Sequence, residues 1–349
     1  MSTPNTTVEP PDSVESTIEP RRIAELANGF RGAKTLLSAV ELGLFTKLAG
    51  ASRDAGTLSQ EVGIAARGAR DFLDTLVALG LLDRDGAGRY RNTPETEQYL
   101  DANKPAYMGA ELAHLNVRMY PHWQHLTKAL RSGEPQSDAG TEGYFNTLYS
   151  DEARRELFVK GMTAGARRSA LAIARRFPWR EFATVMDVGT AEGGLPVEIA
   201  TVHPHITGGG FDLPAVAPQF DRHVRAHNLS ERLRFYPGDF HCDPLPRMDV
   251  MVFGRVLHNW DLATKKMLLK KAHDALPTGG AVIIYERLID DDRRVNAQAL
   301  LGSLNMLLMT SGGFDFTGAD CVGWMEETGF REICVGALTS DMSMVTGLK

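Results

Sequence analysis

The chain has 349 residues, 43% of them hydrophobic and 23% charged, a composition typical of a protein with a large core that needs no disulfide or structural metal. Its 44 acidic residues outnumber its 38 lysines and arginines, and the resulting net charge of −6 argues against nucleic acid, whose phosphates require a basic surface. No apolar run is long enough for a membrane span, and the length predicts two domains.

The N-terminus and the cysteines indicate where the protein works. Residues 1–20 are polar and contain several prolines, so we expect a disordered tail, and they lack the basic and apolar regions of a signal peptide. The three cysteines, Cys242, Cys321 and Cys334, form no CxxC pair, and their odd number argues against a disulfide framework. We therefore predict a reduced, cytoplasmic protein.

Residues 21–104 are predicted to be helical with a small terminal hairpin. The segment GAKTLLSAVELGLFTKLAG has apolar residues at helical spacing, and LLDRDGAGRYRNT carries a turn signal between two short strands. Helices followed by a β-wing are typical of a winged helix, which raises DNA binding as an alternative. The segment 21–100 holds 11 basic and 10 acidic residues, too balanced for a DNA reader, so we favour a packing or dimerisation domain.

Residues 105–180 are predicted to be a helical linker whose aromatic side chains can line a pocket. From residue 181 to 349 short apolar runs alternate with helical segments, which predicts an α/β, Rossmann-like domain with a parallel sheet covered on both faces. The expected strands lie in ATVMDVG, ITGGGFDLP, RLRFYPGDF, MDVMVFGRVLH and GGAVIIYERLI, with two closing strands in GFREICVGAL and SMVTGLK.

Each of the five predicted parallel strands ends near an ionisable residue. These residues are Asp187, Asp212, Asp239, His258 and Glu286. Ligands of open parallel sheets bind outside the carboxyl ends of the strands, so we expect these groups to meet in one site. Stability alone does not require ionisable groups at all of these positions.

The loop GTAEGG and two aspartates favour a nucleoside-like cofactor. Glycines after the first strand let a ligand approach the backbone, although the loop does not continue as the G-x-G-x-x-G fingerprint. A carboxylate at Asp212 can accept both ribose hydroxyls, a role shared by nicotinamide and adenosyl cofactors. Asp239 beside Phe240 suits an adenine, with a hydrogen bond at its edge and a ring on its face.

His258 is the best candidate for a catalytic base. A neutral imidazole near its ordinary pKa can take a proton from a phenol or enol, and Glu286 on the neighbouring strand can orient the ring. The pair His203/His205 and the run His241-Cys242-Asp243 match no standard spacing of metal ligands, so we expect surface residues there and no metal.

Several motifs in family order make residues 21–349 resemble the small-molecule O-methyltransferases typified by the plant caffeic acid and animal acetylserotonin enzymes, with many bacterial natural-product members. The motifs are KTLLSAVELGLF, MDVGTAEGG, GGGFDLP, PGDF, RVLHNWD, ALPTGGAVIIYE and SGGFDFTGAD. The resemblance implies a winged-helix-like dimerisation domain, a homodimer, and a methyltransferase domain that binds S-adenosylmethionine.

The resemblance also implies roles for individual residues. His258 is the expected base, with Glu286 and Asp315 as the carboxylates beside it. The expected cofactor contacts are Tyr149, Gly189, Asp212, Gly238, Asp239, Phe240 and Arg255. The expected substrate contacts are Met162, Asn259, Asn305 and Met309.

The chain departs from the family pattern at three places. The glycine-rich loop reads DVGTAEG, His-Asp-Trp becomes His258-Asn259-Trp260, and the second glutamate is shortened to Asp315. The last two changes leave the substrate and the acceptor atom open.

The leading hypothesis is O-methylation of a small aromatic or enolic metabolite. The alternatives are C-methylation of a 2-oxo acid or of an aromatic carbon beside a phenol, with or without a metal, a nicotinamide oxidoreductase, and a cofactor-sensing regulator.

Overall fold

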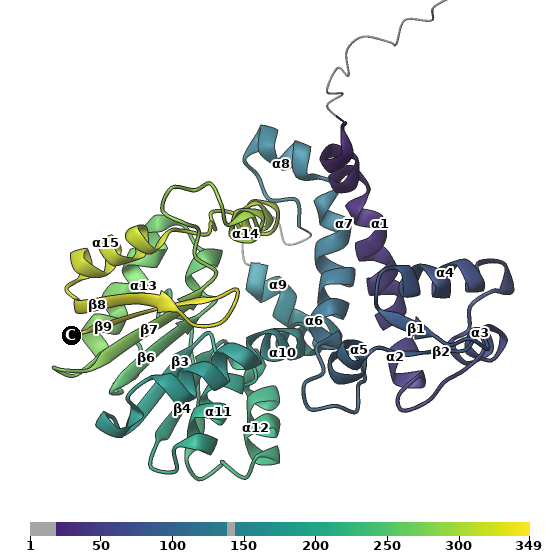
Figure 1. The fold of residues 1–349 in the computed structure, drawn as a ribbon. Coiled ribbons are helices and arrows are strands. Elements are labelled where there is room, and N and C mark those ends of the chain that lie inside the picture. Colours follow the sequence, from purple (N-terminus) through teal and green to yellow (C-terminus); the bar gives the residue numbers. More distant parts are fainter. Residues whose placement is uncertain (1–18, 138–143) are drawn as a thin grey trace, which may run out of the picture.

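The computed structural model describes residues 19–137 and 144–349, which form two lobes joined by long helices (Figure 1). The predicted disordered tail therefore lies, apart from its last two residues, outside the described residues. In the part that is described, no helix is both long and apolar enough to cross a bilayer. The three cysteines are free thiols.

The N-terminal lobe contains the predicted helices and hairpin. Its elements are α1 (Arg21–Glu41), α2 (Leu44–Lys47), α3 (Ala55–Val62), α4 (Ala66–Ala78), β1 (Leu82–Arg84), β2 (Tyr90–Asn92) and α5 (Pro94–Tyr99). The antiparallel pair β1 and β2 forms the wing, and Leu44, Phe45 and Leu73 are buried in the core beneath it. Only the second half of α1 joins this core, through the buried Ala39 with Leu36 and Val40 packed beside it.

The helices of residues 105–180 connect the two lobes. They are α6 (Gly109–His114), the π-helical turn η1 (Leu115–Met119), α7 (Tyr120–Trp123), α8 (Leu126–Ser132), α9 (Tyr144–Ser150), α10 (Glu152–Arg176) and the short turn η2 (Trp179–Glu181). The long helix α10 packs against α6 on one side and α11 (Gly194–Val202) on the other. The linker segment is thus a wall shared by both lobes.

The second lobe is built on a mixed sheet of seven strands in the described residues. The strands are β3 (Thr184–Val188), β4 (Thr207–Asp212), β5 (Leu233–Pro237), β6 (Val250–Gly254), β7 (Ala281–Glu286), β8 (Arg331–Ala337) and β9 (Ser343–Leu348). Their order is β5-β4-β3-β6-β7-β9-β8. Strands β3 to β7 are parallel, while β9 and β8 add antiparallel at the edge. This confirms the predicted Rossmann-like class.

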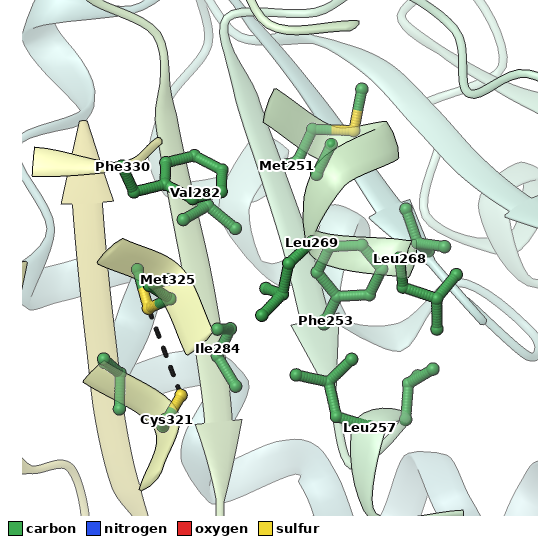
Figure 2. Packing of buried hydrophobic residues seen from close by; sticks show 14 of the residues in the cluster. Met251, Phe253, Leu257, Leu268, Leu269, Val282, Ile284, Cys321, Met325 and Phe330 are labelled. Atoms are coloured by element: carbon green, nitrogen blue, oxygen red, sulfur yellow. Dashed lines mark hydrogen bonds between the residues drawn. The ribbon is translucent and has the colours of Figure 1, made fainter. Parts of the chain in front are cut away.

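Helices cover both faces of the sheet because its central strands are apolar on both sides. On one face Phe253 and Ile284 pack against Leu269 of α13 (Leu262–Ala275) and Met325 of α15 (Gly318–Thr328), as Figure 2 shows. On the other face α10 and α11 cover the sheet. The remaining elements are η3 (Pro214–Val216), α12 (Ala217–Ala226), η4 (Leu257–Asn259) and α14 (Ala297–Met309).

The strand order reverses between β3 and β6. The connections from these two strands therefore leave in opposite directions, which opens a crevice at their carboxyl ends. The linker helices and α14 stand over this edge of the sheet (Figure 1). The fold thus places the binding site where the two lobes meet.

Candidate active site

A cavity of about 1030 Å³ lies at the carboxyl edge of the sheet. The ionisable residues at the five strand ends, Asp187, Asp212, Asp239, His258 and Glu286, all line it. Every residue predicted for catalysis, cofactor or substrate also lines it: Tyr149, Met162, Gly189, Asp212, Gly238, Asp239, Phe240, Arg255, His258, Asn259, Glu286, Asn305, Met309 and Asp315. The topology thus brings residues that are far apart in the sequence to one place.

His258 lies on the short turn η4, which follows β6, with two carboxylates on one side of its ring. Its Nδ1 lies 3.1 Å from Oε2 of Glu286 and 3.4 Å from Oδ1 of Asp315. The histidine side chain is 14% exposed, while the two carboxylates are almost fully buried. With Nδ1 facing the carboxylates, Nε2 is the ring nitrogen that can accept a proton.

Neighbouring residues hold this cluster in place. Arg255, three residues before His258, has a φ of +57°, a left-handed conformation that costs a residue with a side chain about 1–2 kcal/mol. Gly302 of α14 lies so close to Asp315 that a Cβ atom there would be 2.9 Å from Oδ2. The backbone N–H of Asp315 donates to Ser303 at 3.2 Å. The backbone therefore holds both the turn that carries His258 and the segment that carries Asp315.

The surroundings change the proton affinity of His258. Burial lowers the pKa of the imidazole, but the charge of Glu286 and the hydrogen bonds to Asp315 and Glu286 outweigh burial and raise that pKa to about 9. This differs from the sequence expectation of an ordinary pKa, because the sequence did not show that two carboxylates share one ring nitrogen. In the ligand-free protein His258 is thus mainly the imidazolium at neutral pH.

Asp212 ends β4 and points into the same cavity. Its two carboxylate oxygens accept the backbone N–H groups of Ala191 at 2.9 Å and Leu213 at 2.8 Å. Burial raises the pKa of Asp212 to about 6, against these two hydrogen bonds. Gly189 has a φ of +76°, and a Cβ atom there would lie 2.7 Å from Val256, so only glycine fits this turn beside the carboxylate.

The segment after β5 supplies the next part of the cavity wall. A Cβ atom at Gly238 would come within 2.6 Å of the Phe211 ring, which explains the need for glycine. Asp239 accepts the backbone N–H of His241 at 2.9 Å, which orients its carboxyl group. The Phe240 ring stands edge-on to Trp260 with centroids 5.4 Å apart. A carboxylate that can accept a hydrogen bond from the amino group, beside an aromatic ring, fits an adenine.

Aromatic rings from α9 and α10 form the opposite wall. Phe145, Phe158 and the buried Tyr149 lie with ring centroids about 6 Å apart. Phe145 also contacts Trp260 at 5.9 Å, which links this wall to the segment that carries His258. The wall is apolar and suits a flat ring system.

The predicted substrate contacts are two asparagines and two methionines. Asn259 donates its side-chain amide to the carbonyls of Arg255 and Val256, so this side chain also braces its own turn. Asn305 accepts the indole N–H of Trp123 at 3.2 Å. Met309 is 1% exposed and packs in the core formed with Ala129 and Leu308, whereas Met162 is only partly buried.

The residue-by-residue prediction missed three buried polar groups near the site. Asp187 was noted only as a strand end, yet burial raises its pKa to about 7. His114 of α6 lines the cavity, its Nδ1 has no hydrogen-bond partner among the described residues, and burial lowers its pKa to about 4. Lys265 of α13 is fully buried, with its ammonium group against the Phe314 ring. A charge at an apolar position of a helix was the available signal for Lys265.

The histidine pairs and the catalytic cluster differ as candidates for metal binding. His203 and His205 lie against the backbone carbonyls of Ala174 and Trp179 at 2.6 and 2.9 Å. The ligand atoms of His258, Glu286 and Asp315, in contrast, lie within 4.8 Å of one another, a spacing that also suits a divalent cation. The prediction of no metal therefore needs a direct test at this cluster.

Comparison with known families gives two matches in chain order. An O-methyltransferase dimerisation domain matches residues 24–102, and an O-methyltransferase domain matches residues 123–331. Together they cover most of the described chain.

Individual proteins are similar over nearly the whole length. The tetracenomycin polyketide synthesis 8-O-methyl transferase TcmO of Streptomyces glaucescens is 41% identical over 95% of this chain and 97% of its own. The N,N-dimethyltransferase OxyT of Streptomyces rimosus is 36% identical over 89% and 90% of the two chains. The crystal structure of human N-acetylserotonin methyltransferase with S-adenosylmethionine superposes with a TM-score of 0.87 at 29% identity, covering 97% and 99%.

Proposed function

Because the chain belongs to the O-methyltransferase family with an N-terminal dimerisation domain, we propose that it methylates a phenolic or enolic hydroxyl of a polycyclic aromatic metabolite, with His258 as the general base. The protein is an S-adenosylmethionine-dependent methyltransferase, so the alternative of a nicotinamide oxidoreductase is wrong. The observation that carries the proposal is the position of His258, with Nδ1 held by carboxylates and the ring lining the cavity.

The residues along the sheet edge fit the cofactor. Asp212 provides a buried carboxylate for the ribose hydroxyls, and Asp239 with Phe240 provides the edge and face contacts for adenine. Gly189 and Gly238 keep the backbone free of side chains at these points. Tyr149 and Arg255 also line the cavity and are proposed to hold the amino-acid end of the cofactor.

The chemistry divides between cofactor and protein. S-adenosylmethionine supplies a methyl group already activated on a sulfonium, whose positive charge in the same cavity favours the neutral form of His258. The protein aligns the acceptor oxygen with that methyl, and Nε2 of His258 takes the hydroxyl proton. Glu286 and Asp315 then stabilise the imidazolium through Nδ1.

The size and lining of the cavity support a large aromatic substrate. Pockets for one small molecule commonly have volumes of about 300–1,000 Å³, so a cavity of about 1030 Å³ has room for a second molecule beside the cofactor. The rings of Phe145, Phe158 and Trp260 line it. TcmO, by its name, acts in polyketide synthesis, and we infer an aromatic polyketide-type substrate here.

A test of the reaction uses adenosylmethionine carrying a carbon-13 methyl, with polyhydroxylated aromatics, aryl amines and 2-oxo acids as acceptors. We expect a methoxy NMR signal from the aromatic hydroxyls that is unchanged by a metal chelator, because a base and an activated methyl suffice. An N-methyl product would show that the acceptor atom is nitrogen, as the name of OxyT states for that relative. A C-methyl product lost with chelator would favour the metal-assisted alternative at the His258 cluster instead.

We also infer a homodimer that forms through α1. Ile23, Leu26 and Phe30 are 72%, 75% and 56% exposed and lie three and four residues apart, so they share one face of the helix. This face belongs to the segment that matches the dimerisation domain. A second copy of the chain would cover these apolar side chains.

Replacing Leu26 and Phe30 together with aspartate should weaken dimerisation at least about tenfold, since charges would be buried in an apolar contact. Analytical ultracentrifugation of the full chain measures the change. The control is Val295→Asp, which changes an 81% exposed valine outside this domain and should leave the dimer intact. Equal dimerisation of both variants would place the interface elsewhere.

A further inference from the structure

Lys265 is a charged side chain enclosed in the second lobe. It lies one turn into α13, after the N-cap Asp261, and its exposed fraction is 0%. Lysines are almost never fully buried unless they are paired. Its neighbours therefore indicate what this ammonium group does.

The contacts of Lys265 lead directly to the catalytic cluster. Its Nζ donates to the carbonyl oxygen of Trp260, which immediately follows the turn that carries His258. The same nitrogen lies 3.3 Å from the ring centroid of Phe314 and 5.7 Å from that of Phe316. These two rings flank Asp315 in the sequence. The ammonium thus touches both segments that meet at His258.

The charges of the cluster formed by His258, Glu286 and Asp315 do not balance without the lysine. Glu286 at the end of β7 and Asp315 before α15 both face one nitrogen of His258, which carries at most one proton. Burial lowers the pKa of Lys265 to about 8, while the charges of Glu286, Asp315 and Asp261 oppose that effect. At neutral pH the lysine is therefore a cation beside an excess of buried negative charge.

We propose that Lys265 is a positioning residue of the active site, whose ammonium group compensates the second carboxylate of the His258–Glu286–Asp315 cluster and anchors the turn that carries His258. This inference rests on the proposed role of His258 as the base. In each turnover the hydroxyl O–H bond breaks and an N–H bond forms at Nε2, while Nδ1 keeps its proton against the carboxylates. The lysine takes part in neither bond change, but its charge sets the electrostatic environment in which the proton is transferred.

The test compares Lys265→Met, Lys265→Arg and Lys266→Met in the pH dependence of kcat. Methionine removes the charge but keeps the length and the contact with the aromatic rings. Loss of a nearby positive charge strengthens proton binding to His258, so the acidic limb of the profile should move to higher pH by about one unit. At a pH on that limb, kcat then falls about tenfold, while KM for S-adenosylmethionine stays unchanged.

The two other variants are matched controls. Arginine keeps the positive charge and should keep the limb close to that of the wild type. Lys266 is the next residue of the same helix, and it pairs with Glu327 at the surface, so Lys266→Met should leave the profile unchanged. A Lys265→Met profile that superposes on the wild type, with only a change in Tm, would overturn the proposal.

A second measurement needs no change at Lys265. In Asp315→Asn, the ammonium loses one opposite charge, so the pKa of Lys265, followed by NMR of its labelled side chain, should fall. An unchanged value would show that the lysine and the cluster are not coupled. If His258→Ala leaves turnover intact, the proposed base is wrong; if it abolishes turnover while both lysine tests fail, only the present inference is wrong.

Discussion

His258→Ala is expected to lower kcat by about 10²–10⁴-fold, the usual contribution of a positioned general base. The substrate hydroxyl would lose the only ring nitrogen that faces it from this cluster, and the carboxylates behind His258 are too deeply buried to replace it. The affinity for S-adenosylmethionine should change little, because His258 is not among the residues proposed to hold the cofactor. Single-turnover rates and calorimetric titration separate the two effects.

The pH dependence of this variant makes the test sharper. A phenol of pKa about 10 ionises without help at high pH, so the activity of His258→Ala should recover as the pH rises toward that value. The wild type should not show this rise over the same range once His258 is neutral. His125→Ala, a change at an exposed histidine outside the cavity, is the control and should match the wild type.

A loss in kcat smaller than about threefold would show that the base is another group or that no base is needed. Removal of the ring also leaves Glu286 and Asp315 facing each other, so His258→Asn provides a second variant with a polar group near Nδ1. Thermal unfolding of both variants shows whether lost activity reflects lost structure. A loss of activity with unchanged Tm supports the base directly.

Asp212→Ala is expected to weaken the binding of S-adenosylmethionine by about 10²–10⁴-fold. Two hydrogen bonds from ribose hydroxyls to a carboxylate contribute about 1.5–3 kcal/mol each, and alanine removes both acceptors. Isothermal titration calorimetry measures the dissociation constant. At saturating cofactor kcat should remain close to that of the wild type, because Asp212 lies on β4, away from the proton transfer at His258.

The pKa of Asp212 adds a pH signature to cofactor binding. The folded protein raises this pKa from 3.8 to about 6 because the carboxyl group is buried. Its contribution to stability is therefore complete below pH 3.8 and is lost as the pH rises through 6. The ionised form is the better acceptor, so the affinity of the wild type for S-adenosylmethionine should fall as the pH drops below about 6.

Two controls make the cofactor result specific. Asp221→Ala changes an exposed aspartate on α12 and should bind the cofactor as the wild type does. Asp212→Asn keeps one oxygen acceptor and should lie between alanine and the wild type. Because Asp212 also accepts the N–H groups of Ala191 and Leu213, circular dichroism and thermal unfolding check that the variant keeps the overall fold. Equal affinity in Asp212→Ala and the wild type would rule out the ribose role.

The sequence alone predicted the class of fold because local pattern decides it. The apolar runs at β3, β6 and β7 are buried on both faces, as is typical of a covered parallel sheet, and the helical N-terminal segment with its short hairpin is visible in the spacing of its residues. The rule that ligands bind at the carboxyl ends of strands then brought Asp212 and His258 to one edge. These inferences need no knowledge of side-chain contacts.

Only the tertiary structure decided the electrostatics of the site. Glu286 was expected to orient His258, but the arrangement of two carboxylates on one nitrogen depends on how α14 lets Asp315 approach through Gly302. That contact joins segments distant in the sequence, and it raises the pKa of His258 to about 9. Lys265 likewise stands in the sequence only as a charge at an apolar position of its helix, and packing decides that its ammonium group is buried against Phe314 and the carbonyl of Trp260. The pattern of residues fixes which side chains share an edge, whereas distance and burial fix their charge.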